Sequence, residues 1–296
     1  MAAIRGDAEQ TITDFLFYLL DAVTNALLQE TAGSTFPNLS REKFENFKIL
    51  LPPIAEQKRI VTILNQQMAA VEQARAATLA QLAAAKALPA AYLRQVFDSP
   101  EAQTWKRKKL GDLIELRREI IHPRDNPKGA ATFVGLEHVQ SVTGKRIGSV
   151  EVEMSQLKGR KPKFYKNDIV YGYLRPYLNK VWLADFEGLC SVDQYVFSVN
   201  SSIVESEFIA WFMRSPTYLS RAPINYTPGQ LPRIRTDEVT SVEVNLPPLQ
   251  KQKEIVQNLT QKLMKSDYIN KCLQEQLDET DQLPAAILRQ AFNGEL

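Results

Sequence analysis

Two stretches of this sequence occur twice, and each second copy lies 195 residues after the first. Residues 51–64, LPPIAEQKRIVTIL, recur at 246–259 as LPPLQKQKEIVQNL. Residues 88–97, LPAAYLRQVF, recur at 283–292 as LPAAILRQAF. Because the distance is the same at both ends, the segments between the paired motifs have equal length. Surface loops rarely keep their length so strictly, whereas long helices that must match a partner do, so the repeat predicts two equivalent helices.

Apolar residues follow the first motif of each copy at alternating spacings of three and four residues. This heptad-like pattern is typical of a narrow seam along one helix face. We therefore expect helices over 54–97 and 249–292 that pack as an antiparallel, coiled-coil-like pair, with a break or kink at Pro89 and Pro284. The residues expected to pack in this seam, between the helices or against a partner, are Val61, Leu64, Met68, Val71 and Leu82 in the first copy and Val256, Leu259, Leu263, Leu273 and Leu277 in the second.

The duplication extends backwards from the helices, but only in part. Residues 14–20, DFLFYLL, are similar to residues 207–213, EFIAWFM. Nothing in the first half of the chain corresponds to residues 105–206. The sequence therefore predicts one complete globular module and the end of another. The predicted domains are a C-terminal remnant of a first module at 1–50, a first spacer helix at 51–103, the complete module at 104–245 and a second spacer helix at 246–296.

The complete module carries the positive charge of the chain. Residues 101–190 hold 17 Lys and Arg against 11 Asp and Glu, whereas the whole chain has 36 against 34. A local basic excess, rather than the overall charge, is what attracts phosphates.

Strand-like runs dominate the module. β-Branched and aromatic residues bounded by Gly, Pro, Asn and Asp predict strands at 132–134, 147–152, 168–174, 180–183 and 194–199. Helices are expected only at its ends, over 110–118 and 206–213, the second opening with a Ser206-Glu207 cap. The predicted fold class is α+β, with a mixed, twisted and partly barrel-like sheet in the module and long antiparallel helices beside it.

Four motifs occur in a recognisable order. The module opens with WKRKKLGDL at 105–113, has FYKNDIV at 164–170 and ends with TPGQLPRI at 227–234, and each helix opens with LPP-x-x-x-QK-x-I. Over essentially the whole chain this order resembles the DNA-specificity subunit of type I restriction-modification systems. Where that family usually has Gly in the middle motif, this chain has Asn167, which is compatible with a turn.

The resemblance implies two target-recognition domains that each read half of a split double-stranded DNA site, held apart by two helices that dock modification subunits. Those partners bind S-adenosylmethionine and methylate adenine, and a further restriction subunit, a motor and endonuclease, uses ATP and Mg²⁺. Because the first recognition domain is represented only by 1–50, this chain resembles a half-length or truncated subunit. As a homodimer through its helices, such a chain would read a palindromic, interrupted target.

Basic side chains fall mainly between the predicted strands, with Tyr and Asn among them. Arg and Lys can pair with guanine or hold phosphates, and Gln can pair with adenine. Of the two tyrosines on one face of the strand 168–174, Tyr171 and Tyr173, one is expected in the core. The residues expected to contact DNA are Arg146, Lys161, Lys163, Tyr173, Arg175, Lys180, Gln230 and Arg233.

Motifs for chemistry within the chain are missing from the sequence. NLPP at 245–248 departs from the Asn-Pro-Pro-Tyr motif of adenine methyltransferases, and His122 and His138 have no second ligand at metal-binding spacing. The sequence therefore predicts no catalytic residue, metal site or cofactor in this chain. Two alternatives stay open: an assembly protein whose module binds protein, and a self-sufficient nuclease or methyltransferase.

The surroundings of the protein can be predicted from two further features. The most apolar stretch, 15–28, is interrupted by Asp21 and Asn25, so no membrane span is expected. Cys190 and Cys272 are too few and too far apart for a disulfide framework. Both features favour a cytoplasmic protein.

Overall fold

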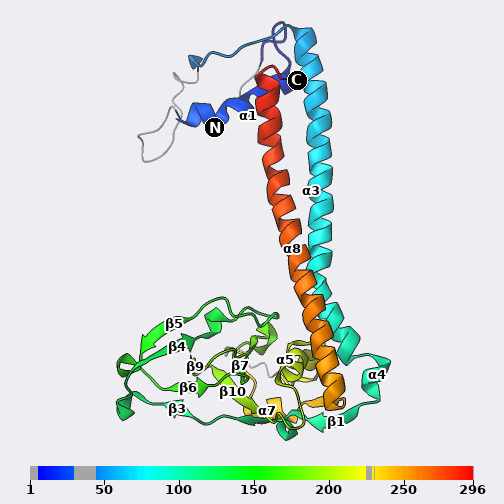
Figure 1. Ribbon diagram of the computed structural model, residues 1–296. Coiled ribbons are helices and arrows are strands. Elements are labelled where there is room, and N and C mark those ends of the chain that lie inside the picture. Colours follow the sequence, from blue (N-terminus) through cyan, green and yellow to red (C-terminus); the bar gives the residue numbers. More distant parts are fainter. Residues whose placement is uncertain (1–5, 30–44, 225–228, 230, 296) are drawn as a thin grey trace. The chain divides into compact units, whose positions relative to one another are not determined.

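The structure, a computed structural model, describes residues 6–29, 45–224, 229 and 231–295 (Figure 1). These residues form two compact units. One draws on residues within 1–85 and 268–296, and the other on 86–267. Helices α3 (Ile54–Phe97) and α8 (Leu249–Phe292) contribute to both units. Their bounds are those predicted from the repeat. In the described part of the chain, every helix is too short or too polar to cross a bilayer.

The first unit is a cluster of helix ends. Helix α1 (Thr13–Gln29) places Phe15 and Leu19 in one buried core with Leu64 of α3 and Leu288 of α8. The ring of Phe15 meets that of Phe292 edge to face, with centroids 5.4 Å apart. Burial of such aromatic and aliphatic side chains contributes about 1.5–3 kcal/mol each, which holds α1 on the helix pair.

The two long helices run antiparallel within each unit. In the first, Arg75 Nε donates to Asp281 Oδ1 at 2.7 Å, and in the second, Lys262 Nζ donates to Gln95 Oε1 at 3.4 Å. All ten predicted seam residues are buried or half-buried.

The two long helices do not break at the prolines where the sequence predicts a break or kink. Helix α3 continues through Pro89 and helix α8 through Pro284. A proline inside a helix costs about 3 kcal/mol. The buried side chains of Leu93 and Leu288, one turn further on, anchor each helix to its core and offset that cost.

The second unit contains the module. Its strands are β1 (Lys106–Lys109), β2 (Ile114–Leu116), β3 (Ile120–Ile121), β4 (Ala130–Val134), β5 (Val150–Glu153), β6 (Lys161–Phe164), β7 (Ile169–Gly172), β8 (Val181–Leu183), β9 (Gly188–Cys190), β10 (Gln194–Val199) and β11 (Glu243–Leu246). Its short helices are α4 (Pro100–Gln103), α5 (Ser206–Arg214), α6 (Pro216–Arg221) and α7 (Thr236–Ser241).

The described strands pair in three sheets. They have the orders β1-β11, β2-β10-β7-β8 and β3-β6-β9-β4-β5. In the last sheet β4 and β9 are parallel and the other neighbours antiparallel, so that sheet is mixed. The predicted α+β class with a mixed sheet is confirmed, although the strands divide among separate sheets where the sequence predicts one.

Helix α5 joins the module to the ends of the long helices that belong to the same unit (Figure 1). Phe97 of α3 contacts Phe208 and Phe212 of α5, with ring centroids 5.4 Å apart in both pairs. The same core includes Tyr171 of β7, which is fully buried, while Tyr173 is half-buried. As expected, one of these two tyrosines belongs to the core.

Two local predictions at the ends of the module are wrong. Residues 110–118 form a single 3-10 turn, Leu110–Asp112, followed by strand β2, which pairs with β10. Gly111 is a poor helix former, and backbone pairing with burial of Ile114 outweighs the local apolar pattern. Helix α5 is not capped by Ser206, because Glu205 is its N-cap residue.

A buried glutamine replaces the predicted cap. Gln252, at the start of α8, has no exposed surface. Its Oε1 accepts the N–H of Glu205 at 2.9 Å. Its Nε2 donates to the carbonyls of Pro247 at 2.8 Å and Ile203 at 3.3 Å. One side chain thus fixes the turn before α8 and the start of α5.

The equivalent glutamine of the first copy makes the same set of hydrogen bonds. Gln57 accepts the N–H of Ile12 at 2.9 Å and donates to the carbonyls of Pro52 at 2.8 Å and Gln10 at 2.9 Å. Residues 10–12 therefore occupy in the first unit the place that 203–205 occupy in the second. The division into the four predicted domains stays a prediction.

The two cysteines differ in accessibility. Cys190 is fully buried in β9, and burial raises the pKa of its thiol to about 12, whereas Cys272 is half-buried. Because the thiolate is the reactive form, we expect the native chain to release about one equivalent of thionitrobenzoate from Ellman's reagent, and the unfolded chain about two. Replacement of Cys272 by alanine should remove the native reaction. Rapid modification of Cys190 in the native chain would contradict this assignment.

Candidate nucleic-acid interface

Two segments far apart in the sequence lie side by side next to β7. An antiparallel bridge joins Leu174 to Arg233. The N–H of Arg175 donates to the carbonyl of Pro232 at 2.7 Å. These backbone contacts bring together three of the residues predicted to contact DNA, Tyr173, Arg175 and Arg233.

Aromatic stacking supports this group. The rings of Tyr173 and Tyr195 stack with centroids 4.5 Å apart and an interplanar angle of 25°. Tyr195 Oη donates to the carbonyl of Ile234 at 3.4 Å, and Tyr173 Oη lies 3.5 Å from Asp193 Oδ1. Burial raises the pKa of Tyr173 above its ordinary value, and the nearby charge of Arg233 opposes that shift. The two tyrosine rings are therefore held in place, with the guanidinium of Arg233 near them.

Tyr195 also lines a cavity of about 380 Å³. Arg117, Arg118 and Arg160 line it together with Val192, which is 41% exposed. Arg118 and Arg160 are exposed and form no ion pair with any described residue. Their guanidinium groups are thus available to an outside acceptor.

These contacts connect six residues through the Tyr173–Tyr195 stack, and we call this group the tyrosine–arginine face. Its members are Arg118, Arg160, Tyr173, Arg175, Tyr195 and Arg233. Arginine forks pair bidentately with phosphate oxygens or with the O6 and N7 atoms of guanine. Arg118, Arg160 and Tyr195 are not among the residues predicted from the sequence to contact DNA. Arg118 and Arg160 stand among other basic residues, and only the fold shows which of these lack a partner.

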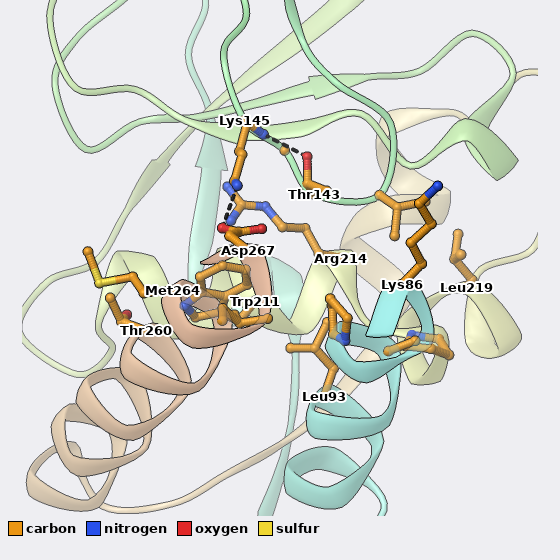
Figure 2. A pocket seen from close by; sticks show the side chains of 16 residues that line it. Lys86, Leu93, Thr143, Lys145, Trp211, Arg214, Leu219, Thr260, Met264 and Asp267 are labelled. Atoms are coloured by element: carbon orange, nitrogen blue, oxygen red, sulfur yellow. Dashed lines mark hydrogen bonds and ion pairs between the residues drawn. The ribbon is translucent and has the colours of Figure 1, made fainter. Parts of the chain in front are cut away.

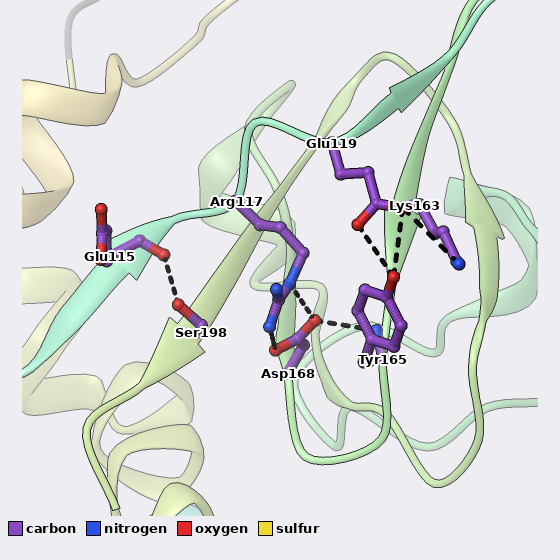
Figure 3. Close-up of polar contacts among 7 residues, drawn as sticks. All are labelled: Glu115, Arg117, Glu119, Lys163, Tyr165, Asp168 and Ser198. Atoms are coloured by element: carbon purple, nitrogen blue, oxygen red, sulfur yellow. Dashed lines mark hydrogen bonds and ion pairs between the residues drawn. The ribbon is translucent and has the colours of Figure 1, made fainter.

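Arg117, by contrast, is held within the module (Figure 3). It pairs with Asp168 through bonds of 2.7 and 2.8 Å, and Asp168 also accepts the N–H of Tyr165 at 2.8 Å. The hydrogen bond with Asp168 raises the pKa of Arg117. Tyr165 Oη donates to Glu119, and Lys163 lies 3.6 Å from that carboxylate and over the Tyr165 ring at 4.6 Å.

The turn before Asp168 explains the departure from the family motif. Asn167 has a φ of +69°, in the left-handed region that glycine and asparagine adopt most readily. Its N–H donates to the carbonyl of Ala184 at 2.8 Å. Asparagine therefore suits the left-handed turn at this position, as glycine would.

Other residues predicted to contact DNA lie elsewhere on the module. Arg146 stacks over Phe186 at 5.0 Å and lies 3.7 Å from Asp185. Lys161 lies over the ring of Phe133 at 4.8 Å. Both side chains are partly engaged, and neither belongs to the tyrosine–arginine face.

The last three predicted residues have different positions. Lys163 pairs with Glu119, as described above. Lys180 Nζ donates to the carbonyl of Leu136 at 2.5 Å, so its charge is directed into the module. Gln230 lies outside the residues that the structure describes.

Comparison with known proteins identifies the family. Residues 2–81 and 102–279 match the family model described as "Type I restriction modification DNA specificity domain". The chain belongs to this family. Its class is that of a DNA-specificity subunit, a recognition component rather than a catalytic one, as the sequence predicts.

Individual relatives agree with this class. The chain is 26% identical to the type I restriction enzyme EcoDI specificity subunit of Escherichia coli, over 96% of this chain and 70% of that protein. It is 24% identical to the EcoKI specificity subunit of Escherichia coli K12, over 92% of this chain and 62% of that protein. The chain thus spans between three fifths and three quarters of these relatives.

Solved structures support the fold. One neighbour, from work on complex assembly and conformational transition of the type I R-M system, has a TM-score of 0.79 at 22% identity, over 99% of this chain and 74% of that one. The HsdS subunit from Thermoanaerobacter tengcongensis has a TM-score of 0.62 at 22% identity, over 99% of this chain and 73% of that one.

Proposed function

We propose that the chain reads one half of a bipartite double-stranded DNA target through the tyrosine–arginine face. The observation that supports this most is the grouping of Arg118, Arg160, Arg175 and Arg233 around the Tyr173–Tyr195 stack, in a protein of the DNA-specificity family. The rigid stack holds the loops, and the arginines supply donors for phosphates and base edges.

The helices would serve as the docking surface for partners. We propose that α3 and α8 bind adenine methyltransferase subunits that carry S-adenosylmethionine, and that a restriction subunit using ATP and Mg²⁺ joins this complex. The duplicated glutamine motif supports two equivalent docking sites, because it builds the same turn at the start of both helices. A homodimer through the helices would supply a second recognition module, and the complex would act in the cytoplasm.

The decisive experiment is co-purification with a modification subunit from the same genome, followed by selection of bound duplexes from a random pool. We expect enrichment of a split motif and methylated adenines within that motif in the genome. A complex that forms but enriches no motif, or leaves adenine unmethylated, would contradict the proposal. Light scattering of the chain alone and of the complex tests the homodimer.

Substitutions in the tyrosine–arginine face should separate two kinds of contact. Because base-edge pairs carry about 1–3 kcal/mol of discrimination, Arg233→Gln is expected to relax the selected motif at one position by about 5- to 150-fold. Arg118→Gln and Arg160→Gln, as phosphate contacts, should weaken binding to all duplexes and each reduce the salt slope by about one.

The control is Arg107→Gln in β1. Arg107 is 69% exposed, lies 3.8 Å from Glu243 and does not belong to the tyrosine–arginine face. The same loss of charge there should leave the motif and the salt slope unchanged. Equal effects at Arg107 and Arg118 would mean that the whole module acts as a diffuse basic surface.

A further inference from the structure

A second cavity, of about 500 Å³, lies in the same unit between the ends of the long helices and the module (Figure 2). Most of its wall is apolar, and the apolar residues include Pro89, Ala90 and Leu93 of α3, Leu263 and Met264 of α8, and Leu219 of α6. The volume falls within the range of about 300–1,000 Å³ that is typical of small-molecule sites. The cavity is separate from the tyrosine–arginine face, since the two share no lining residue.

One charged side chain stands buried in this wall. Arg214 of α5 is only 7% exposed. Its Nε donates to the carbonyl of Val181 at 2.8 Å, and its guanidinium stacks over the ring of Trp211 at 4.6 Å. Its two terminal amino groups have no hydrogen-bond or ion-pair partner among the described residues. Trp211 also lines the cavity, and its buried indole N–H has no acceptor within the described part of the chain.

A buried arginine without a counter-charge is costly, because its lost hydration is not replaced. Burial lowers the pKa of Arg214 to about 10, so the group still carries its charge at neutral pH. An anion bound in the cavity would supply the missing acceptors. Charge-assisted bonds to a carboxylate are stronger than neutral ones, and arginine makes them in pairs.

The charges around the cavity favour an anion. Lys86 and Lys145 line it with Arg214, and Asp267 is the one carboxylate in the lining. Asp267 is already paired with Lys145. Glu207 lies outside the lining, and its negative charge raises the pKa of Arg214, against the larger effect of burial. Its carboxylate accepts a hydrogen bond from the hydroxyl of Thr260 at 3.1 Å.

The loop that closes one side of the cavity has an uncommon backbone. Val142, which lines the cavity, has a φ of +67°, and a β-branched residue rarely adopts this conformation. Two carbonyls, those of Leu178 and Asn179, hold its N–H at 3.2 and 3.1 Å. Such strain persists where the surrounding structure imposes it, and it gathers at ligand sites.

We propose that this cavity binds a small organic anion with an apolar body, whose carboxylate pairs with the terminal amino groups of Arg214. The apolar body would pack on the face of Trp211 and against Ala90, Leu93 and Leu263. Such a ligand would add contacts between both helix ends and the 142–145 loop of the module. This site is independent of the DNA-reading surface.

The test uses a matched pair of probes on the full chain, 5-fluoroindole-3-acetate and 5-fluoroindole-3-acetamide, followed by fluorine NMR. The two have the same shape and differ in charge. We expect saturable binding of the acid with a Kd of about 1 mM or tighter. The amide should bind at least about tenfold more weakly, because it cannot form the charged pair with Arg214.

Three variants locate the binding. Arg214→Met should weaken binding of the acid until its Kd equals that of the amide. Ala90→Trp should fill the cavity and abolish binding of both probes. Arg94→Met removes the same charge from an exposed position of α3 outside the cavity lining and should leave the preference for the acid unchanged within about twofold.

The proposal is overturned if the unmodified chain binds neither probe, or binds acid and amide equally. It is also overturned if Arg94→Met removes the preference as Arg214→Met does. The comparison of the two probes needs no variant, so it decides even if Arg214→Met unfolds. Duplex selection is a separate measurement, so failure here leaves the proposed DNA recognition standing.

Discussion

Replacement of Asp168 by alanine is expected to lower the free energy of unfolding of the module by about 3 kcal/mol. Asp168 is 3% exposed, and it accepts two bonds from Arg117 and one from the N–H of Tyr165. Alanine removes all three and leaves a partly buried guanidinium and a backbone N–H without acceptors. The Arg117 side chain is 28% exposed, so water can hydrate its guanidinium when Asp168 is removed. The expected cost therefore lies at the lower end of the range for a broken buried ion pair.

Tryptophan fluorescence during denaturation measures this effect selectively. Trp105, Trp182 and Trp211 all lie within 86–267, so the signal reports the unit that contains the module. Asp185→Ala is the matched control, because that carboxylate is 63% exposed and lies 3.7 Å from Arg146. It should cost less than about 1 kcal/mol. An equally small effect at Asp168 would mean that the Arg117 pair does not stabilise the module.

The sequence predicts the long elements of this fold well and the short ones less well. Helices 54–97 and 249–292 follow from the repeat, because two copies of a long periodic pattern outweigh local exceptions such as Pro89. The helix predicted at 110–118 is wrong because strand β2 forms by pairing with β10, some 80 residues further on. A local sequence pattern contains no information on such a distant partner. The predicted cap of α5 is wrong for the same reason, because the hydrogen bond at its start comes from Gln252, on a helix distant in sequence.

The candidate site is predicted only in part, and the reason is physical. Charge and residue type point to the basic residues of the module but do not say which of them have internal partners. Lys163 and Lys180 are engaged within the module. Arg118 and Arg160 remain available. The motif residues Asp168 and Gln252 are easy to find in the sequence, yet both hold the fold together rather than face a ligand.

Replacement of Gln252 by leucine should be the most damaging change at the helix motif. Leucine has nearly the same size but cannot replace the three hydrogen bonds with Pro247, Ile203 and Glu205. Each buried polar group left without a partner costs about 1–3 kcal/mol, so we expect a loss of at least about 3 kcal/mol in the tryptophan-monitored transition. Gln257→Leu, on an exposed position of the same helix, should change that transition by less than about 0.5 kcal/mol.

The internal duplication provides a second test of the same chemistry. Gln57→Leu removes the equivalent bonds in the first unit, which contains no tryptophan among its residues. We expect it to increase amide hydrogen exchange in α1 while the tryptophan-monitored transition keeps its midpoint. Gln252→Leu should do the reverse and leave exchange in α1 unchanged. If either substitution affects both measurements equally, the two units unfold as one, and the glutamines stabilise the chain jointly rather than each its own helix start.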